Sequence, residues 1–192
     1  RVYHQGVCMK AIFLTALFVL TSLVTGCDQI RQFDVSEKVI NDYLSQKSGL
    51  QKHIGEDGVV SADITLSDLA IQIGRTEPGK VSFSGSASLK IDSLFGKTGA
   101  NVNLTLSGQP FYQAELGAIY IKSMKIDSYK VSPEKMEPVV MALKPYLDTT
   151  IATYFDNQPV YVLNPEKNSA EAAAFKLAKG IEVKPGKFVI QL

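Results

Sequence analysis

The sequence predicts an α+β fold in which a long, curved antiparallel β-sheet wraps around one long amphipathic helix in the C-terminal half. Between residues 59 and 131, apolar and polar residues alternate in runs that are separated by short turns, which indicates consecutive antiparallel strands. Over residues 136–155, apolar residues recur at helical spacing, which indicates the long helix. Shorter helical patterns follow Ser36 and Ser169.

The chain begins with the pattern of a secretory signal. Met9 and Lys10 form a charged start, residues 11–20 are apolar, and small residues precede Cys27 in the stretch Leu-Val-Thr-Gly-Cys. This arrangement resembles the lipobox of bacterial lipoproteins, in which the cysteine is acylated and becomes the new N-terminus. We therefore expect translation to start at Met9, residues 1–26 to be removed, and residues 27–192 to form a single lipid-anchored domain.

Two other interpretations of this start remain open. An ordinary signal peptide could carry the cysteine by chance, and the apolar run could be a short transmembrane helix. The run of about 13 apolar residues is shorter than the roughly 20 that a spanning helix needs. The lipobox reading implies that the membrane is a partner through the acylated Cys27 and that the domain faces the periplasm. In enteric bacteria, an aspartate at the position of Asp28 favours the inner membrane, and the outer membrane stays an alternative.

Composition excludes some classes of function. Without Arg1 and Lys10, the 20 basic residues no longer outnumber the 19 acidic ones, so no basic field is available and nucleic acid is not expected as a partner. The only cysteines are Cys8 and Cys27, so the expected domain contains no disulfide and must be held by its hydrophobic core.

The first elements after the anchor are short. Residues 30–34 predict a tether or a first strand. Ser36 is a good N-cap for an amphipathic helix that ends at Ser48-Gly49, with Asp34 and Glu37 as a second capping pattern. Residues 50–58 look like a polar loop.

The strand patterns carry two further predictions. The phase of the alternation changes near Ser67-Asp68, which indicates a bulge or bend. In residues 81–92 the inner face includes the small residues Gly85 and Ala87, which permit strong curvature or leave space. Turns are expected at residues 75–80, 96–99 and 114–117, with strands over residues 102–106 and 119–131.

The long helix is expected to start at Ser132-Pro133-Glu134, with Ser132 as the N-cap, and to stop at Gln158-Pro159. Pro145 lies inside it and should kink or split it. Its apolar face is formed by Met136, Val139, Val140, Leu143, Tyr146, Leu147, Ile151, Tyr154 and Phe155. The chain then predicts a short strand over residues 160–163, a helix over 169–179 that Ser169 caps, and a hairpin over 181–190.

Groups that could carry chemistry are few. His53 is the only histidine after the signal, so a histidine base with a nucleophile has this single possible centre, in the polar loop, where a solvated histidine is the simpler interpretation. One histidine is too few for a typical zinc site, and no metal or cofactor is expected. Asp63 and Asp68 could pair in space. Ser132 and Lys135 match Ser-x-x-Lys and residues 97–99 match Lys-Thr-Gly, both parts of the β-lactamase signature, but in the reverse order. Capping and turn formation explain both matches, so we do not expect an enzyme, and a hydrolase stays only a third hypothesis.

The apolar face of the helix suggests a function. If the sheet and the helix leave an elongated groove between them, the protein can bind a lipid or another hydrophobic ligand there. The residues expected to line this groove are Phe83, Leu89, Leu104, Met136, Val140, Leu143, Leu147 and Ile151. The alternative is a solid core and a module that docks on another protein of the cell envelope.

Five segments spread over the expected domain are distinctive, namely Gln72–Pro78, Asp92–Gly96, Pro133–Met136, Gln158–Leu163 and Leu177–Gly186. Through these segments and the lipobox, the sequence resembles the YceB family of bacterial lipoproteins across essentially all of the expected domain. The fold of that family is similar to the tubular lipid-binding (TULIP) domains. The resemblance implies lipid binding through analogy of fold and transfers no site residue.

Overall fold

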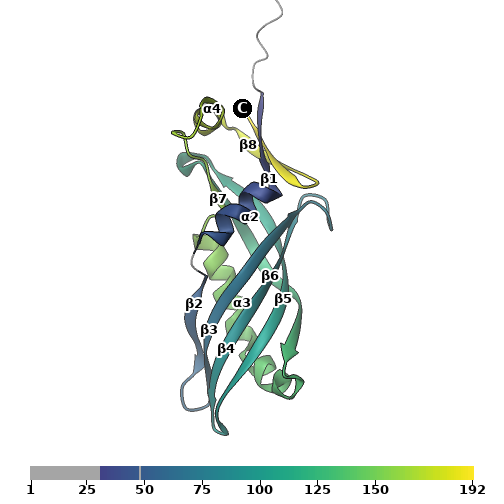
Figure 1. Ribbon diagram of the computed structural model, residues 1–192, viewed down its shortest axis with the longest axis vertical. Coiled ribbons are helices and arrows are strands. Elements are labelled where there is room, and N and C mark those ends of the chain that lie inside the picture. The colour runs from purple at the N-terminus through teal and green to yellow at the C-terminus, as the bar shows by residue number, and fades with distance from the viewer. Residues whose placement is uncertain (1–30, 48) are drawn as a thin grey trace, which may run out of the picture. The chain divides into compact units, whose positions relative to one another are not determined.

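The computed structural model describes residues 31–47 and 49–192, and its helices and strands all belong to the unit of residues 31–192 (Figure 1). The lipobox, Cys27, Asp28 and the expected start at Met9 lie outside the described residues. The elements in chain order are β1 (Gln32–Ser36), α2 (Glu37–Ser45), β2 (Gln51–Glu56), β3 (Val60–Ile73), β4 (Val81–Ser93), β5 (Gly96–Gln113), η2 (Ala114–Leu116), β6 (Ala118–Ser132), η3 (Glu134–Met136), α3 (Glu137–Asn157), β7 (Tyr161–Val162), α4 (Ser169–Leu177), β8 (Gly180–Lys184) and β9 (Lys187–Gln191).

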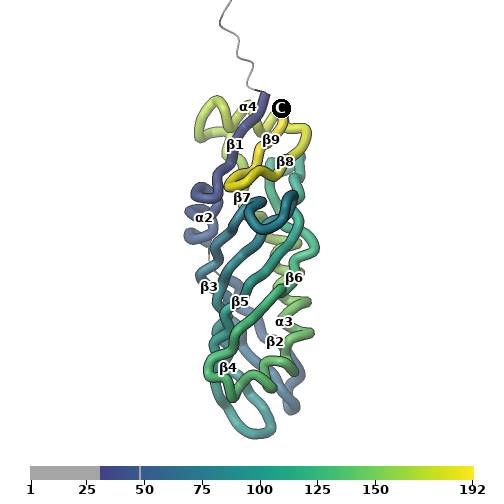
Figure 2. Tube along the Cα trace, turned by 90° about the vertical axis from the view of Figure 1, so that its right-hand side faces the viewer, coloured from purple at the N-terminus to yellow at the C-terminus, as the bar shows by residue number. Residues whose placement is uncertain are grey.

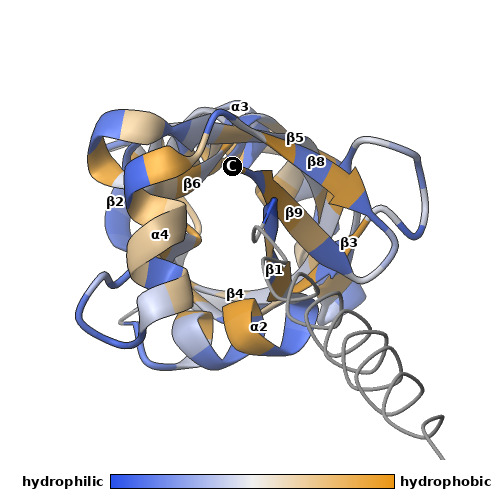
Figure 3. Cartoon of the chain, turned by 90° about the horizontal axis from the view of Figure 1, so that it is seen from above, coloured by the Kyte–Doolittle hydropathy of each residue, from blue (hydrophilic) through white to orange (hydrophobic). Residues whose placement is uncertain are grey.

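The predicted α+β fold with a curved antiparallel sheet is confirmed. Six strands pair in the order β2-β3-β4-β5-β6-β7, and the sheet is open rather than closed into a barrel. Seen along the long axis of the unit, the strands curve around, with α3 and β4 on opposite sides (Figure 3). Helix α3 contacts β6, β2 and β3, so it covers the concave face where the sheet does not close on itself (Figure 2).

A second, smaller sheet joins the two ends of the described chain. Its strands pair in the order β1-β9-β8, all antiparallel. The C-terminal hairpin is confirmed, and the pairing of β1 with it is a contact that the sequence pattern did not indicate. The Gly186 backbone N–H donates to the Ile73 carbonyl at 2.8 Å, which attaches the tip of this hairpin to the end of β3.

The expected polar loop over residues 50–58 is wrong, because most of it forms strand β2. The residues of β2 alternate little in hydropathy, because this edge strand buries only Ile54. Pairing with β3, from Gln51↔Thr65 to Glu56↔Val60, makes the segment a strand through backbone hydrogen bonds that leave no signature in side-chain pattern.

The turn expected at residues 96–99 is also misplaced. Ser93 pairs with Gly96, so the chain reverses at Leu94 and Phe95, and β5 already begins at Gly96. Strand β5 continues to Gln113 and so extends beyond the strand expected over residues 102–106 at both ends. Strand β6 confirms the prediction for residues 119–131 and is longer by one residue at each end.

The helix starts differ from the prediction by a few residues. Ser132 is the last residue of β6 and caps nothing, while α3 begins at Glu137 after the short η3. Helix α4 is capped by Asn168, whose side chain accepts from the Glu171 N–H at 2.8 Å, rather than by Ser169. At α2 the prediction is confirmed, because the Ser36 hydroxyl accepts from the Val39 N–H at 3.3 Å.

Pro145 does not split the long helix, which runs without a break to Asn157. Pro145 is exposed, and Met141, whose carbonyl loses its hydrogen-bond partner, is 57% exposed. Water can therefore replace the missing N–H. The apolar face is confirmed for Val140, Leu143, Leu147, Ile151 and Phe155, whereas Tyr146 is 41% exposed and lies outside it.

Among the described residues, none of the helices combines the length and the hydropathy that crossing a membrane requires.

Candidate functional site

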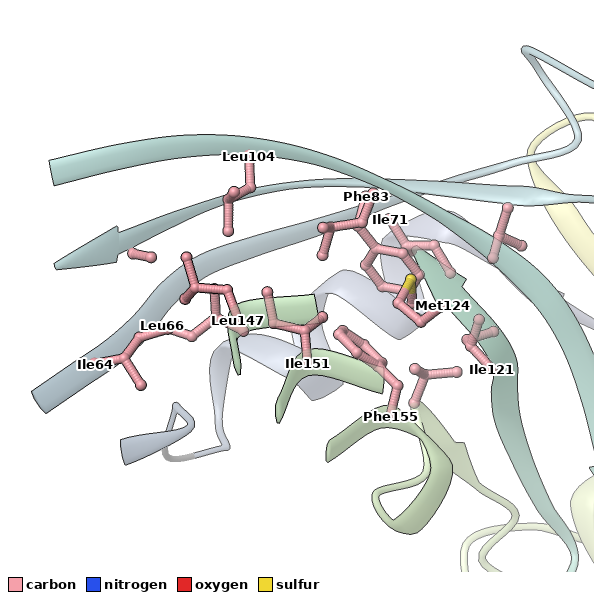
Figure 4. Close-up of a cluster of buried hydrophobic side chains, with 14 of the residues drawn as sticks. Ile64, Leu66, Ile71, Phe83, Leu104, Ile121, Met124, Leu147, Ile151 and Phe155 are labelled. Carbon is pink, nitrogen blue, oxygen red and sulfur yellow. The ribbon is translucent and has the colours of Figure 1, made fainter. Parts of the chain in front are cut away.

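The eight residues expected to line a groove lie together in the interior. Each is at most 8% exposed, and all belong to one cluster of packed side chains between α3 and the sheet. Figure 4 shows Phe83 and Leu104 from the sheet facing Leu147 and Ile151 from α3. The side chains thus fill the space between helix and sheet with one another, and the concave face of the sheet is occupied by α3.

The small inner residues of β4 do not leave free space either. A Cβ atom on Gly85 would lie 2.9 Å from the Leu69 side chain, so Leu69 occupies the room that Gly85 provides. Leu69 reaches this place because of the predicted bulge in β3, which is confirmed. The register with β4 shifts between Ser67 and Ala70, and Asp68 has a φ of 55°.

A cleft of about 680 Å³ lies beside this bulge. Its walls come from the end of α2, the start of β2, the bulge of β3, the end of α3 and the segment after it. The lining residues are Leu44, Ser45, Lys47, Gly49, Leu50, Gln51, Leu66, Ser67, Asp68, Leu69, Tyr154, Phe155, Gln158, Pro159 and Val160.

None of the eight expected residues lines this cleft. Leu104 lines a second depression of about 410 Å³, whose other lining residues are mostly polar residues of β4, β5 and β6. Phe155 connects the core to the cleft, because its ring packs on Phe83 with 5.1 Å between ring centroids and also forms part of the cleft wall.

Gly49 allows the chain after α2 to approach β3 closely. A Cβ atom at this position would lie 2.0 Å from the Leu66 carbonyl oxygen. Next to it, the Leu66 N–H donates to the Leu50 carbonyl at 2.8 Å. This close approach forms one wall of the cleft. In the sequence, the wall was indicated only by the change of phase in β3 and by the glycine at position 49.

Polar and apolar groups contribute about equally to the surface of the cleft. Leu66, Phe155 and Val160 lie beneath its floor and are at most 1% exposed, while Leu44, Leu50 and Leu69 are half-buried and line it. The rim residues Lys47, Gln51, Asp68 and Gln158 are exposed. Apolar side chains next to polar groups suit a small amphiphilic molecule.

Two groups at the rim shape its electrostatics. The Lys47 ammonium lies 4.8 Å from the centre of the Tyr43 ring, a cation–π contact. Burial raises the pKa of the Tyr154 hydroxyl, and the Lys47 charge acts on it in the opposite direction. Tyr154 is therefore a neutral hydrogen-bond donor at physiological pH.

His53 lies on β2 rather than in a loop. Its Nδ1 is 2.8 Å from Asp63 Oδ1 and its Nε2 is 3.1 Å from Asp57 Oδ1. The hydrogen bond with Asp63, followed by that with Asp57, raises the pKa of His53. Asp63 thus pairs with His53, and Asp68 hydrogen-bonds with Ser67 instead of with Asp63. Within residues 31–47 and 49–192 no group of three histidine, cysteine or acidic side chains could hold a metal ion.

Ser132, Lys135 and residues 97–99, which suggested a hydrolase, lie in one region of the fold. Within residues 31–47 and 49–192 no hydrogen bond joins the Ser132 and Lys135 side chains. Ser132 and Lys135 are both exposed, and Ser132 pairs with Asn101 of β5. Thr98 lies 4.0 Å from the Met136 sulfur, which brings the start of β5 next to η3. In the described part of the chain no base hydrogen-bonds to the Ser132 hydroxyl, an interaction that nucleophilic catalysis uses.

Comparison with known proteins gave one family and close relatives. The family profile described as "Protein of unknown function (DUF1439)" matches residues 35–187. A protein of Salmonella typhimurium named "Uncharacterized lipoprotein YceB" is 44% identical over 182 residues, covering 95% of this chain and 98% of the relative. Its namesake in Escherichia coli is 43% identical over 182 residues, with the same coverage.

Proposed function

The chain belongs to the family described as "Protein of unknown function (DUF1439)", and on this premise we propose that it is a membrane-anchored lipoprotein of the bacterial envelope that binds an apolar ligand in the cleft beside the β3 bulge. The names of its relatives support the lipoprotein part, in line with the resemblance to the YceB family. The lipobox supports Cys27 as the acylated residue and a domain that faces the periplasm. Asp28 favours the inner membrane.

One observation carries the ligand-binding part, namely that the half-buried side chains of Leu44, Leu50 and Leu69 surround an open depression, beneath which Leu66 and Phe155 belong to the packed core. A volume of about 680 Å³ lies inside the range of roughly 300–1,000 Å³ that small-molecule sites occupy. Apolar surface that faces water is costly, and a bound acyl chain would remove this surface from water.

The packed interior argues for the cleft rather than for the space between α3 and the sheet. Leu143 and Leu147 are at most 2% exposed and already contact the sheet side chains. A ligand could enter there only by displacing them from an interior that is packed as densely as a crystal. Entry into the cleft requires no such displacement.

A fluorescence titration tests this proposal. The chain contains no tryptophan, so a Gln51→Trp variant of residues 28–192 places the only indole at the cleft. Monopalmitoyl glycerol, a neutral single-chain amphiphile below its critical micelle concentration, should shift the emission to the blue in a saturable way. Leu44→Gln should weaken this binding because it places an amide on the apolar wall.

A matched variant makes the result specific. Gln109→Trp places the indole on an exposed position of β5 that does not line the cleft, and its emission should not respond. Equal responses from both reporters would indicate adsorption to the surface, and the absence of any response at position 51 would refute ligand binding in the cleft.

A second candidate, a docking module for another envelope protein, is favoured by a different observation. At the β4–β5 turn Leu94 is 77% exposed and Phe95 is 98% exposed, at the end of the unit opposite to β1 (Figure 1). A photo-crosslinking residue at position 95 should then give one discrete protein adduct in cells, whereas the same residue at Leu177, which is 58% exposed on α4, should not. No difference between the two positions would count against docking at the turn.

A further inference from the structure

Two hydrogen-bond donors at the cleft lack an acceptor within the described part of the chain. Lys47 and Tyr154 both line the cleft. Among residues 31–47 and 49–192, no carboxylate lies within 4.0 Å of the Lys47 ammonium and the Tyr154 hydroxyl makes no hydrogen bond. The Lys47 ammonium contacts the Tyr43 ring instead. Both groups are therefore available to a ligand.

One charged residue of each sign lines the cleft, namely Lys47 after α2 and Asp68 on the β3 bulge. The Ser67 hydroxyl donates to the Asp68 carboxylate at 2.9 Å, and Asp68 also lines the neighbouring depression. Within residues 31–47 and 49–192 the Lys47 ammonium forms no ion pair with Asp68, so it can pair with an anionic group of a ligand.

We propose that the ligand of the cleft is an amphiphile whose head group carries an anionic oxygen, a carboxylate or a phosphate, which accepts hydrogen bonds from Lys47 and Tyr154. Its acyl chain lies against the half-buried side chains of Leu44, Leu50 and Leu69. This inference rests on the proposed function and adds the class of ligand. Hydrogen bonds from a cationic donor to an anionic oxygen are stronger than neutral ones, so the head group would determine selectivity while the chain supplies the hydrophobic part of the affinity.

The test compares head groups on the same chain length. Isothermal titration of residues 28–192 uses palmitate, hexadecyl phosphate and the neutral monopalmitoyl glycerol, all below their critical micelle concentrations. The wild-type domain should bind at least one anionic probe about tenfold more tightly than the neutral one, a difference of roughly 1.4 kcal/mol. Lys47→Gln should remove this preference and leave the affinity for monopalmitoyl glycerol unchanged. Tyr154→Phe should reduce the preference for the anionic probe.

A control and three outcomes complete the test. Lys52→Gln removes a cation of the neighbouring strand β2 that does not line the cleft, and it should leave all affinities unchanged. A preference for palmitate or for hexadecyl phosphate that Lys47→Gln abolishes supports the inference and identifies the head group. If the wild-type domain binds neutral and anionic probes equally well, the inference is overturned and the proposed function is left intact. The same conclusion follows if Lys47→Gln lowers the affinity for neutral and anionic probes by the same factor. No binding of any probe to the wild-type domain overturns both.

Discussion

Glu37 and Arg75 form an ion pair that connects α2 with the turn after β3. Arg75 Nε lies 2.9 Å from both carboxylate oxygens of Glu37, and Glu37 Oε2 also accepts from the Ile73 N–H at 2.8 Å. The Glu37 side chain is only 16% exposed, whereas that of Arg75 is 56% exposed. The first turn of α2 is therefore held to the end of the large sheet by one partly buried carboxylate.

This arrangement predicts a pH-dependent loss of stability in Glu37→Gln. The hydrogen bond with Arg75 is the main reason that the pKa of Glu37 is lower than its ordinary value of 4.5. Its contribution is therefore complete above pH 4.5 and is lost as the pH falls through the lower folded-state pKa. Because Arg75 is exposed, we expect a loss of about 1 kcal/mol in the free energy of unfolding at pH 7.

Urea denaturation at pH 7 and pH 3 measures this difference. Glu77→Gln is the control, because Glu77 pairs with Lys80 on the surface and is 59% exposed. A deficit in Glu37→Gln that is as large at pH 3 as at pH 7 would contradict the assignment of the effect to the ionised carboxylate.

His53 should titrate above its ordinary pKa of 6.5, because the hydrogen bonds with Asp63 and then with Asp57 stabilise the imidazolium. The stabilisation it provides is complete below pH 6.5 and is lost as the pH rises through the folded-state pKa. NMR detects this transition directly, since residues 28–192 contain only this histidine. Asp63→Asn should lower the midpoint more than Asp57→Asn does, and a wild-type midpoint at or below 6.5 would show that the pairs do not form in solution.

Gly49→Ala should destabilise the fold through a direct collision. The new methyl group would lie 2.0 Å from the Leu66 carbonyl oxygen, so the backbone must move, at a cost of about 1–3 kcal/mol. Gly180→Ala is the control, because a Cβ atom there meets no atom within 4 Å. Thermal unfolding should separate the two variants by several degrees, and equal melting temperatures would show that the chain after α2 does not approach β3 this closely.

Phenylalanines at two positions should differ strongly in their contribution to stability. Phe155 is 1% exposed and packs on Phe83, so Phe155→Ala should cost about 3–5 kcal/mol. Phe95 is 98% exposed, so Phe95→Ala should change the free energy of unfolding by less than about 0.5 kcal/mol. Urea denaturation of both variants checks this contrast. A large loss in Phe95→Ala would mean that the β4–β5 turn is covered by another part of the molecule.

Local patterns predicted most of the fold. The alternation in β4 and the apolar spacing in α3 reveal which side chains face inward, because a strand has a period of two and a helix a period of 3.6 residues. The phase change at Ser67-Asp68 correctly indicated the bulge. Strand β2 was missed because an edge strand with one buried residue has almost no pattern of its own.

The candidate site was less predictable than the fold. The eight residues expected to line a groove do face one another, but side-chain pattern cannot distinguish a filled interior from a groove, because that depends on how closely helix and sheet approach. The cleft combines Leu44, Leu66 and Phe155, which are distant in the sequence and share no motif.

The types and order of most elements, and the inward faces of β4 and α3, can be deduced from the residues alone. The pairing of β1 with β9, the filling of the space above Gly85 by Leu69, and the open cleft beside α2 and α3 emerge only in the folded molecule. Periodicity and capping act between neighbours along the chain, whereas pairing and packing depend on the distance between segments that only the complete fold brings together.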